Sequence, residues 1–353
     1  MRAAVLREHG EPLDVTDVPE PELDSDGVVV DVEACGICRS DWHAWMGHGE
    51  WADDAVEPGQ ILGHEPAGRV VAVGERVETI REGDRVALPF NLACGSCGYC
   101  RIGHGNVCTG DHPHALGFEQ TAQGAFAEQV HLPSAEYNAI RLPDGVASRD
   151  VAALGCRFMT AYNALDARAG LRAGEWVAVH GCGGVGLSAI QVANALGARV
   201  VAVDVRESAL DVAAELGADE LVDASAEDPV AAIRGVTDGG ADVSVDALGV
   251  AETCRNSVRC VRPRGTHVQV GLTTDAERGE VSLPTDWMTR HEVSFVGARG
   301  MPPTSASDLL SLLESDAVDP GSLVTKTVSL DEVPERLAAM TDYDTVGVEV
   351  MTM

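Results

Sequence analysis

The sequence predicts an α/β protein in which a mostly β domain is joined to a doubly wound parallel sheet. With 353 residues, of which 45% are hydrophobic, the chain is long enough for two domains. Residues 1–150 contain short β-type runs separated by glycine and proline, whereas strand-type and helix-type runs alternate after residue 150. We therefore expect one domain from residues 1–150 and 298–353, and a second from residues 151–297.

The first domain is expected to be a compact, mostly antiparallel β unit. Its β-type runs lie at residues 28–32, 68–74, 84–88 and 125–130. Pro66-Ala67-Gly68 is typical of a turn and stands directly before the second run. The C-terminal part adds amphipathic helices at 305–313 and 331–340 and a last strand at 346–350.

The second domain alternates strand and helix, which is the pattern of a parallel sheet. Strands are expected at residues 176–180, 199–203, 220–222, 242–246, 266–271 and 293–297. A helix begins at Val185 and ends at Leu196-Gly197, and a second covers residues 208–216 before Gly217. Glycine at both helix ends supplies the left-handed cap residue.

The charge balance is strongly acidic, with 56 acidic against 25 basic residues, a net charge of -31 and Lys326 as the single lysine. Such self-repulsion is relieved when molar salt shortens the Debye length to about 3 Å, so we expect a salt-adapted cytoplasm. Nucleic acid is not expected as a partner, because little basic charge is present to neutralise phosphates.

Membrane and secretory segments are not expected either, since no apolar run approaches the roughly 18 residues of a span and the N-terminus lacks a signal-peptide core. A cytoplasmic location follows. In that compartment, ten cysteines favour metal ligation or buried thiols over disulfides.

A glycine-rich motif follows the first strand of the second domain and fits the pattern G-x-G-x-x-G between a strand and a helix. Its glycines allow a tight turn, close approach to a pyrophosphate and close helix packing, while the helix N-terminus attracts phosphate. The expected cofactor-binding residues of the motif are Gly181, Gly183, Gly184, Val185 and Gly186.

The next strand ends at Asp204, close to the position of the carboxylate that binds the adenosine ribose in such sites. A carboxylate there repels a 2′-phosphate, so NAD is favoured. Arg206 nearby leaves NADP possible, and capping of the following helix is the alternative role for Asp204.

Four cysteines are spaced C-x₂-C-x₂-C-x₇-C, with glycines between them. This spacing suits a closed tetrahedral zinc site of structural type, and it lacks the usual ferredoxin arrangement of an iron–sulfur cluster. The predicted ligands are Cys94, Cys97, Cys100 and Cys108.

Reactive groups also gather from Cys35 to His43, directly after the first predicted strand. Gly63-His64-Glu65 and Gly155-Cys156 are two further candidate ligand positions. A lone His or Cys is usually a buried core residue, and spacing alone does not join Cys38, His64 and Cys156 into one site.

The whole chain resembles the zinc-dependent alcohol dehydrogenases of the medium-chain dehydrogenase/reductase family. The likeness rests on the ordered set 36–41, 63–65, the four-cysteine lobe, 155–156 and the glycine motif. It implies a GroES-like catalytic domain beside a Rossmann domain, with two zinc ions per chain and NAD or NADP. A homotetramer is expected, with a dimer as the alternative.

In that family the residues matching Cys38, His64 and Cys156 bind the catalytic zinc and leave its fourth position for water or substrate. Asp41 would orient His64. Glu65 would lie behind the zinc or exchange onto it, an ion pair being the alternative.

The resemblance also assigns the residues around Cys38. Arg39 would bind the cofactor pyrophosphate. Ser40 would take the alcohol proton, and His43 would pass it toward solvent. One departure is Ala209, because many relatives carry a lysine in this region; Arg206 is the candidate substitute.

The implied reaction is hydride transfer between a primary or secondary alcohol and NAD(P). A polyol, sugar or formaldehyde-adduct dehydrogenase of the same fold is the first alternative, although Cys156 stands where several polyol enzymes have glutamate. A non-catalytic nucleotide-binding protein is the second.

Overall fold

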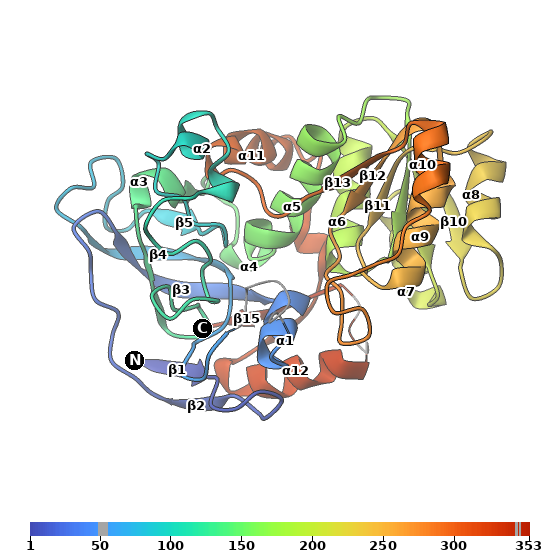
Figure 1. The fold of residues 1–353 in the computed structure, drawn as a ribbon. Helices are drawn as coiled ribbons and strands as arrows, with labels where there is room; N and C mark the ends of the chain where they lie inside the picture. Colours follow the sequence, from blue (N-terminus) through green and yellow to red (C-terminus); the bar gives the residue numbers. More distant parts are fainter. Residues whose placement is uncertain (49–55, 343–344, 346) are drawn as a thin grey trace. The chain divides into compact units, whose positions relative to one another are not determined.

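The structure is a computed structural model that describes residues 1–48, 56–342, 345 and 347–353. Two compact units make up the chain (Figure 1). Unit 1 comprises Met1–Met159, Gly300–Glu314 and Asp319–Met353, and unit 2 comprises Thr160–Arg299 and Ser315–Val318. The expected α/β fold class is confirmed, with a mixed sheet in unit 1 and a parallel sheet in unit 2.

Unit 1 is built on a seven-stranded sheet and a two-stranded sheet. Its strands are β1 (Arg2–Val5), β2 (Asp14–Asp17), β3 (Val28–Ile37), β4 (Glu65–Val73), β5 (Arg85–Ala87), β6 (Gln129–Leu132), β7 (Ile140–Arg141), β14 (Val324–Val328) and β15 (Val348–Thr352). Its helices are α1 (Arg39–Trp45), α2 (Gly98–Arg101), α3 (Ala135–Asn138), α4 (Ser148–Val151), α11 (Ala306–Glu314) and α12 (Val333–Ala339). Short 3-10 helices cover Gly105–Val107, Pro303–Ser305, Pro320–Leu323, Leu330–Glu332 and Met340–Asp342, and a π-helical turn covers Leu154–Phe158.

Strand β3 is the centre of the larger sheet, whose order is β14-β15-β3-β4-β5-β7 with β6 also paired to β3. Its side chains are almost all buried, as its β-branched sequence predicts. Antiparallel pairing of β3 with β4 sets Gly36 opposite Glu65. The residue after β3 and the residue before β4 therefore lie side by side, which decides where the site forms.

Unit 2 contains a six-stranded parallel sheet in the order β10-β9-β8-β11-β12-β13. Its strands are β8 (Trp176–His180), β9 (Arg199–Asp204), β10 (Glu220–Asp223), β11 (Ala241–Asp246), β12 (Val261–Gln269) and β13 (Ser294–Gly297). Its helices are α6 (Gly184–Ala195), α7 (Glu207–Glu215), α8 (Pro229–Val236), α9 (Ala251–Cys260) and α10 (Thr285–His291), with a π-helical segment at Asn163–Arg168. The α-helix α5 (Met159–Tyr162) stands at the division between the units.

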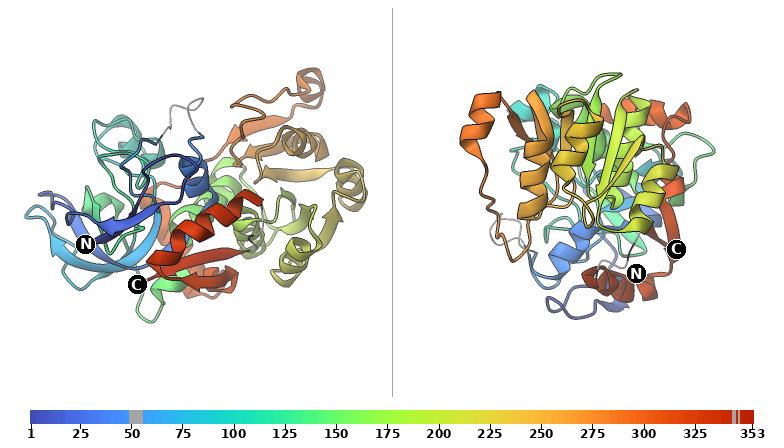
Figure 2. Two further views of the ribbon diagram at one scale, coloured as in Figure 1. Left: turned by 90° about the horizontal axis from the view of Figure 1, so that it is seen from below. Right: turned by 90° about the vertical axis from the view of Figure 1, so that its right-hand side faces the viewer.

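Helices lie on both sides of this sheet, as the second view of Figure 2 shows. Helices α6 and α7 contact each other and β9, whereas α8 and α9 contact each other and α9 packs on β11 and β12. The strand order reverses direction between β8 and β11, which is where ligands of such sheets bind, at the carboxyl ends of the strands. Both helix ends predicted at glycine are confirmed, because Gly197 and Gly217 have φ angles of +77° and +94°.

Three local predictions were wrong. Pro66-Ala67-Gly68 is not a turn but part of β4, where Pro66 pairs opposite Cys35. The strand expected at 125–130 lies further along the chain, at β6, although the carbonyl of Phe126 accepts a hydrogen bond from Ala4. The reactive stretch from Cys35 to His43 was expected to follow the first strand, but its first three residues belong to β3 and residues 39–43 belong to helix α1. The last strand, β15, begins after the predicted start at Val346, which lies outside the described residues.

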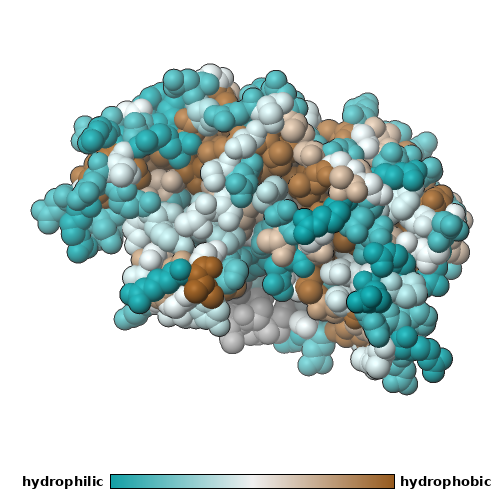
Figure 3. Space-filling view, turned by 90° about the horizontal axis from the view of Figure 1, so that it is seen from above, coloured by the Kyte–Doolittle hydropathy of each residue, from teal (hydrophilic) through white to brown (hydrophobic). Residues whose placement is uncertain are grey.

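Hydrophilic residues predominate around the outline of the face shown in Figure 3, and hydrophobic ones gather in smaller areas between them. Among the described residues, no helix is long and apolar enough to span a membrane.

Candidate metal centres and nucleotide site

Pairing between β3 and β4 brings the first two candidate ligands together in unit 1. Cys38 follows β3 directly, and His64 precedes β4 directly. The third ligand comes from the π-helical turn, where the amide of Phe90 donates to the carbonyl of Gly155 at 3.3 Å. A side chain at Gly155 would lie 2.5 Å from the carbonyl oxygen of Leu88, so only glycine allows the turn to come this close.

The result is a buried cluster of four possible ligands whose atoms all lie within 4.8 Å of one another: Cys38, His64, Glu65 and Cys156. Each of these side chains is at most 7% exposed. Phe90 and Phe118 pack against the imidazole of His64, with ring centroids 5.7 and 4.8 Å away. The surroundings are therefore apolar, and a cation held here would be shielded from bulk water.

Asp41 fixes the orientation of His64. One carboxylate oxygen, Oδ1, accepts from His64 Nδ1 at 2.7 Å and from the amide of Gly63 at 3.1 Å. The other accepts from the amide of Cys38 at 2.9 Å, at the start of α1. In the neutral ring, this contact makes Nδ1 the protonated nitrogen and leaves the lone pair on Nε2.

The residues fit a zinc ion by their own chemistry. His64 Nε2 is buried and has no hydrogen-bond partner, and it belongs to the cluster that contains two thiols. Such an orphaned acceptor is costly unless a cation or donor meets it. Two sulfur ligands and one imidazole are a set that zinc prefers, and three protein ligands leave a fourth position open.

The pKa values of the two thiols shift in opposite directions. A hydrogen bond from Cys156 lowers the pKa of Cys38 well below its usual value, whereas this bond and burial raise the pKa of Cys156. Burial raises the pKa of Glu65, and the charge of Arg157 opposes this shift and favours the carboxylate. Thiolate character at Cys38 favours binding of a soft or borderline cation.

Arg157 is the charged residue beside this cluster that sequence reasoning missed. It is only 3% exposed, and its Nη1 lies 3.1 Å from Glu65 Oε2. A single arginine within the apolar run 151–159 was the available signal, because an isolated charge in such a run predicts a buried partner.

The remaining predicted residues of this stretch lie on α1. The hydroxyl of Ser40 lies 3.9 Å from the sulfur of Cys38. His43 Nδ1 lies 3.1 Å from His48 Nδ1, and burial, followed by the charges of Arg39 and His48, lowers the pKa of His43 to about 4. The guanidinium of Arg39 lies 3.6 Å from the ring centroid of Trp42 and donates to the carbonyl of Met340.

The four-cysteine lobe forms a second cluster. Four sulfur–sulfur distances within it range from 3.5 to 4.0 Å, close to the roughly 3.8 Å between sulfurs that share one zinc at about 2.3 Å. Backbone amides donate to the sulfurs of Cys94, Cys97 and Cys108, which favours thiolates. His112 Nε2 lies 3.2 Å from Cys108, and with His114 these residues form a third group of possible ligands.

Unit 2 places the glycine motif between β8 and α6 as predicted. Gly181 has φ +92°, and a side chain at Gly186 would lie 1.8 Å from the Gly181 carbonyl oxygen. At Gly183, by contrast, an added Cβ would meet no atom within 4 Å. The open space at Gly183 suits approach of a ligand, whereas Gly186 is needed for packing of the helix on the strand.

Asp204 ends β9 beside this turn. Its Oδ2 accepts from the amide of Cys182 at 2.8 Å, and its Oδ1 accepts from the amide of Arg206 at 3.0 Å. The Arg206 guanidinium lies 3.4 Å from the same Oδ1. The other cysteines that received no role, Cys35, Cys182, Cys254 and Cys260, are all buried.

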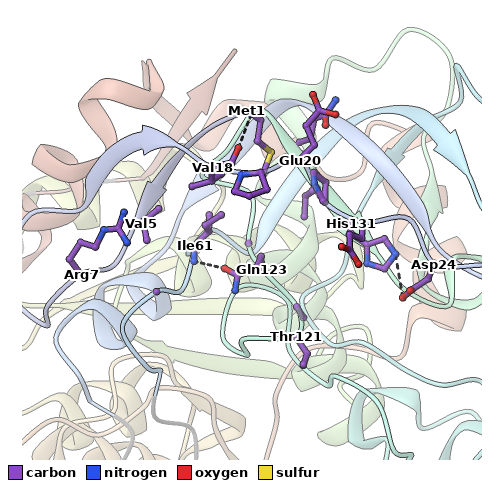
Figure 4. Close-up of a pocket in the computed structure, with 18 residues that line it drawn as sticks. Met1, Val5, Arg7, Val18, Glu20, Asp24, Ile61, Thr121, Gln123 and His131 are labelled. Atoms are coloured by element: carbon purple, nitrogen blue, oxygen red, sulfur yellow. Dashed lines mark hydrogen bonds and ion pairs between the residues drawn. The ribbon is translucent and has the colours of Figure 1, made fainter.

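A separate cavity of about 490 Å³ lies in unit 1 beside β1 and β6 (Figure 4). Val5, Ile61 and Val130 contribute apolar surface, and Arg7 and Asp24 contribute charge. Among the described residues that line it, none belongs to the predicted metal or nucleotide sites.

The two clusters in unit 1 and the dinucleotide motif in unit 2 are those of a metal-dependent dehydrogenase. Two family models match the chain: the alcohol dehydrogenase GroES-like domain at residues 24–144 and the zinc-binding dehydrogenase domain at residues 184–315.

Curated relatives and solved structures agree with these matches. An alcohol dehydrogenase of Geobacillus stearothermophilus is 35% identical, covering 95% of this chain and 94% of the relative. An NAD-dependent alcohol dehydrogenase of Sulfurisphaera tokodaii is also 35% identical, covering 99% of both chains. The structure of an alcohol dehydrogenase from Thermus sp. ATN1 is similar with a TM-score of 0.89 and 33% identity, covering 100% of this chain and 99% of that one.

The chain therefore belongs to the zinc-dependent alcohol dehydrogenases of the medium-chain dehydrogenase/reductase family, and it is an oxidoreductase. The predicted family, fold class and enzyme class are confirmed, and the non-catalytic alternative is not supported.

Proposed function

We propose that this enzyme transfers hydride between a primary or secondary alcohol and NAD, with two zinc ions per chain. Cys38, His64 and Cys156 would hold the catalytic zinc. A structural zinc would be held by Cys94, Cys97, Cys100 and Cys108. The observation that carries the proposal is the buried lone pair of His64 Nε2, which Asp41 orients beside two thiols.

The roles follow from what each group offers. Zinc bound by these ligands supplies Lewis acidity toward the alcohol oxygen, and the nicotinamide supplies the hydride chemistry. Ser40 would accept the alcohol proton, and the 3.9 Å between its hydroxyl and the Cys38 sulfur supports this role. Arg39 would bind the pyrophosphate as a forked cation.

His43 would relay the proton onward and would hold it only transiently. Its lowered pKa keeps the ring neutral near neutral pH, so it does not store the proton. The 3.1 Å contact between the Nδ1 atoms of His43 and His48 requires that one ring donates and the other accepts. A proton can therefore pass from the first imidazole to the second.

For the nucleotide, the geometry of Asp204 supports NAD. Its carboxylate ends β9 beside the glycine turn, where it would meet the ribose hydroxyls. NADP use would require Arg206 to leave its contact with Asp204 and meet the 2′-phosphate. Turnover measured with both nucleotides separates these cases.

Cys38→Ser tests the zinc assignment, with Cys35→Ala as the control because Cys35 is equally buried three residues earlier. Cys38→Ser should lose one of two zinc ions per chain and at least about a thousand-fold in turnover, since Lewis acidity is worth several kcal/mol. Binding of NADH should be retained. Full activity and zinc content in Cys38→Ser would refute the assignment.

The substrate class needs a panel of alcohols. Relatives include a geraniol dehydrogenase of Castellaniella defragrans and an L-threonine 3-dehydrogenase of Bacillus licheniformis, each 36% identical. Primary, secondary, allylic and polyhydroxy alcohols should be compared under one set of conditions. We expect simple alcohols to give the highest kcat/KM, and preference for polyols would support the alternative instead.

We also propose that copies of the chain associate through unit 2. Strand β13 is the last strand of the sheet, and the described residues provide no further strand beyond it. Phe295 on β13 is 40% exposed, and no side chain of α10 is buried. Edges of this kind are usually covered. Light scattering distinguishes monomer, dimer and the expected tetramer.

A further inference from the structure

One buried arginine directly follows one of the three proposed zinc ligands, and its guanidinium contacts a residue next to each of the other two. Arg157 directly follows Cys156 in the chain. Its Nη1 pairs with Glu65, the residue after His64, at 3.1 Å. Its Nη2 donates to the carbonyl of Ile37, the residue before Cys38. The arginine thus connects the three segments that supply the ligands.

Both members of the ion pair are withdrawn from water, with Arg157 3% exposed and Glu65 0% exposed. The backbone amide of Arg157 adds a hydrogen bond to Glu65 Oε1 at 3.2 Å. A buried pair of this kind is seldom a net gain in stability over apolar residues. Its position behind the ligand set indicates a role in the chemistry of the site.

Glu65 lies within reach of two partners. One of its oxygens belongs to the cluster with Cys38, His64 and Cys156, whose ligand atoms lie within 4.8 Å of one another. The same carboxylate pairs with Arg157. A carboxylate is itself a competent zinc ligand, so Glu65 can compete with substrate for the fourth position.

We propose that Arg157 is a positioning residue that holds Glu65 away from the zinc and so keeps the fourth ligand position available to the substrate. This inference rests on the proposed zinc site. Arginine suits the task because its guanidinium is always charged, and its two ends reach different partners, Nη1 the carboxylate of Glu65 and Nη2 the carbonyl of Ile37.

The test uses the full-length enzyme with cobalt(II) in place of the catalytic zinc, because cobalt absorption reports the number and kind of its ligands. The variants are Arg157→Met, Arg157→Lys, Glu65→Gln and the double variant Arg157→Met/Glu65→Gln. Arg336→Met is the matched control, since Arg336 also pairs with a buried glutamate of unit 1, Glu349, at 2.7 Å. Imidazole serves as the external ligand, and its affinity is read from the cobalt spectrum.

In Arg157→Met, Glu65 should enter the cobalt coordination sphere. We expect an altered visible spectrum and imidazole binding weaker by about ten-fold or more, the size of effect seen when residues behind metal ligands are changed. The double variant should regain the wild-type spectrum and imidazole affinity, because the neutral amide that replaces the carboxylate of Glu65 is a poor ligand. Arg157→Lys should be intermediate, and Arg336→Met should match wild type.

An unchanged spectrum and imidazole affinity in Arg157→Met would overturn the inference and leave Arg157 a purely structural residue. If Arg157→Met does not fold, Arg157→Lys decides: wild-type imidazole affinity in that variant would equally overturn it. Failure of the proposed function is distinguishable, because the wild-type enzyme would then show no thiolate-to-cobalt absorption from Cys38 and Cys156.

Discussion

At the scale of single residues, Asp41 organises the catalytic cluster although it contributes no ligand. Its two oxygens accept from the amide of Cys38, the amide of Gly63 and Nδ1 of His64. The carboxylate is fully buried, so its hydrogen bonds come from these three donors and not from bulk water. One side chain thereby sets the start of α1, the approach to β4 and the tautomer of the imidazole.

Asp41→Asn should lower zinc affinity by roughly 10- to 100-fold, the range for residues that orient metal-bound imidazoles. The amide group has only one acceptor oxygen, so it cannot serve the Cys38 amide and His64 together. Competition with a chromophoric chelator measures the affinity. Asp31→Asn is the control, because the exposed side chain of Asp31 on β3 bonds only to Gln129 among the side-chain contacts we identify. Equal zinc affinity in both variants would contradict the role of Asp41.

At the scale of elements, the sequence predicted the β8–α6–β9 unit well. Its signals are local: a β-branched run, a glycine motif with fixed spacing and a capping glycine at Gly197. The cysteine lobe is also local, because its four thiols lie close together in the chain. Both could be read from spacing alone.

The catalytic cluster could not be predicted from the spacing of residues in the chain. Cys38 and His64 meet because β3 and β4 pair in antiparallel register, and Cys156 joins them through the Phe90–Gly155 contact. Strand pairing and such long-range contacts depend on packing of the whole unit. Only the resemblance to a family anticipated the cluster, and it gave no role to Arg157.

The glycine motif allows a matched pair of substitutions within one turn. Gly186→Ala would place its Cβ 1.8 Å from a backbone oxygen, so we expect a loss of stability of at least about 1–3 kcal/mol in unit 2 and loss of NADH binding. Gly183→Ala meets no atom within 4 Å and should leave thermal unfolding unchanged. It should still weaken NADH binding by about ten-fold or more, because its methyl group faces the expected pyrophosphate.

Calorimetry and NADH fluorescence titration measure these two quantities. The two glycines differ in role only if the variants differ in stability. Equal destabilisation by both, or full NADH affinity in Gly183→Ala, would contradict this assignment of the turn.

A chain of buried polar groups crosses the sheet of unit 2. His180 contacts the sulfur of Cys260 at 3.4 Å, and His267 contacts Ser257 Oγ at 2.8 Å. Burial lowers the pKa of His180 to about 3 and that of His267 to about 4, from an ordinary value of 6.5. Both rings are therefore neutral in the folded protein near neutral pH.

The unfolded chain binds these protons more readily, so stability is fully present above pH 6.5 and is lost as the pH falls toward 4. At about pH 5 each histidine should lower the free energy of unfolding by about 2 kcal/mol relative to about pH 7.5. His267→Gln should reduce this acid sensitivity, whereas exposed His104→Gln should not. Denaturant unfolding at both pH values tests the prediction, and identical acid sensitivity in wild type and His267→Gln would rule it out.

At the scale of the whole molecule, the dominant electrostatic feature is the net charge of -31. Several of the ion pairs that we identify are at exposed side chains, such as Arg7 with Asp14 and Arg264 with Glu292. Exposed pairs of this kind contribute at most about 1 kcal/mol each. They cannot offset the repulsion from a large excess of like charge. The stability of the folded protein must therefore depend on the salt concentration of the solvent.

We expect the thermal unfolding temperature to rise with KCl from about 0.05 to 2 M, with most of the rise complete near 1 M, where the Debye length falls to about 3 Å. Glu82, Glu215 and Glu227 are exposed, and their joint replacement by glutamine should raise stability at low salt and flatten the salt dependence. Calorimetry of both proteins across the KCl series, with sucrose as an uncharged co-solute, separates screening from general solute exclusion. If the variant and the wild type gain equally from KCl, or if wild-type stability is already maximal in dilute buffer, charge repulsion does not limit this protein and the expected salt adaptation is wrong.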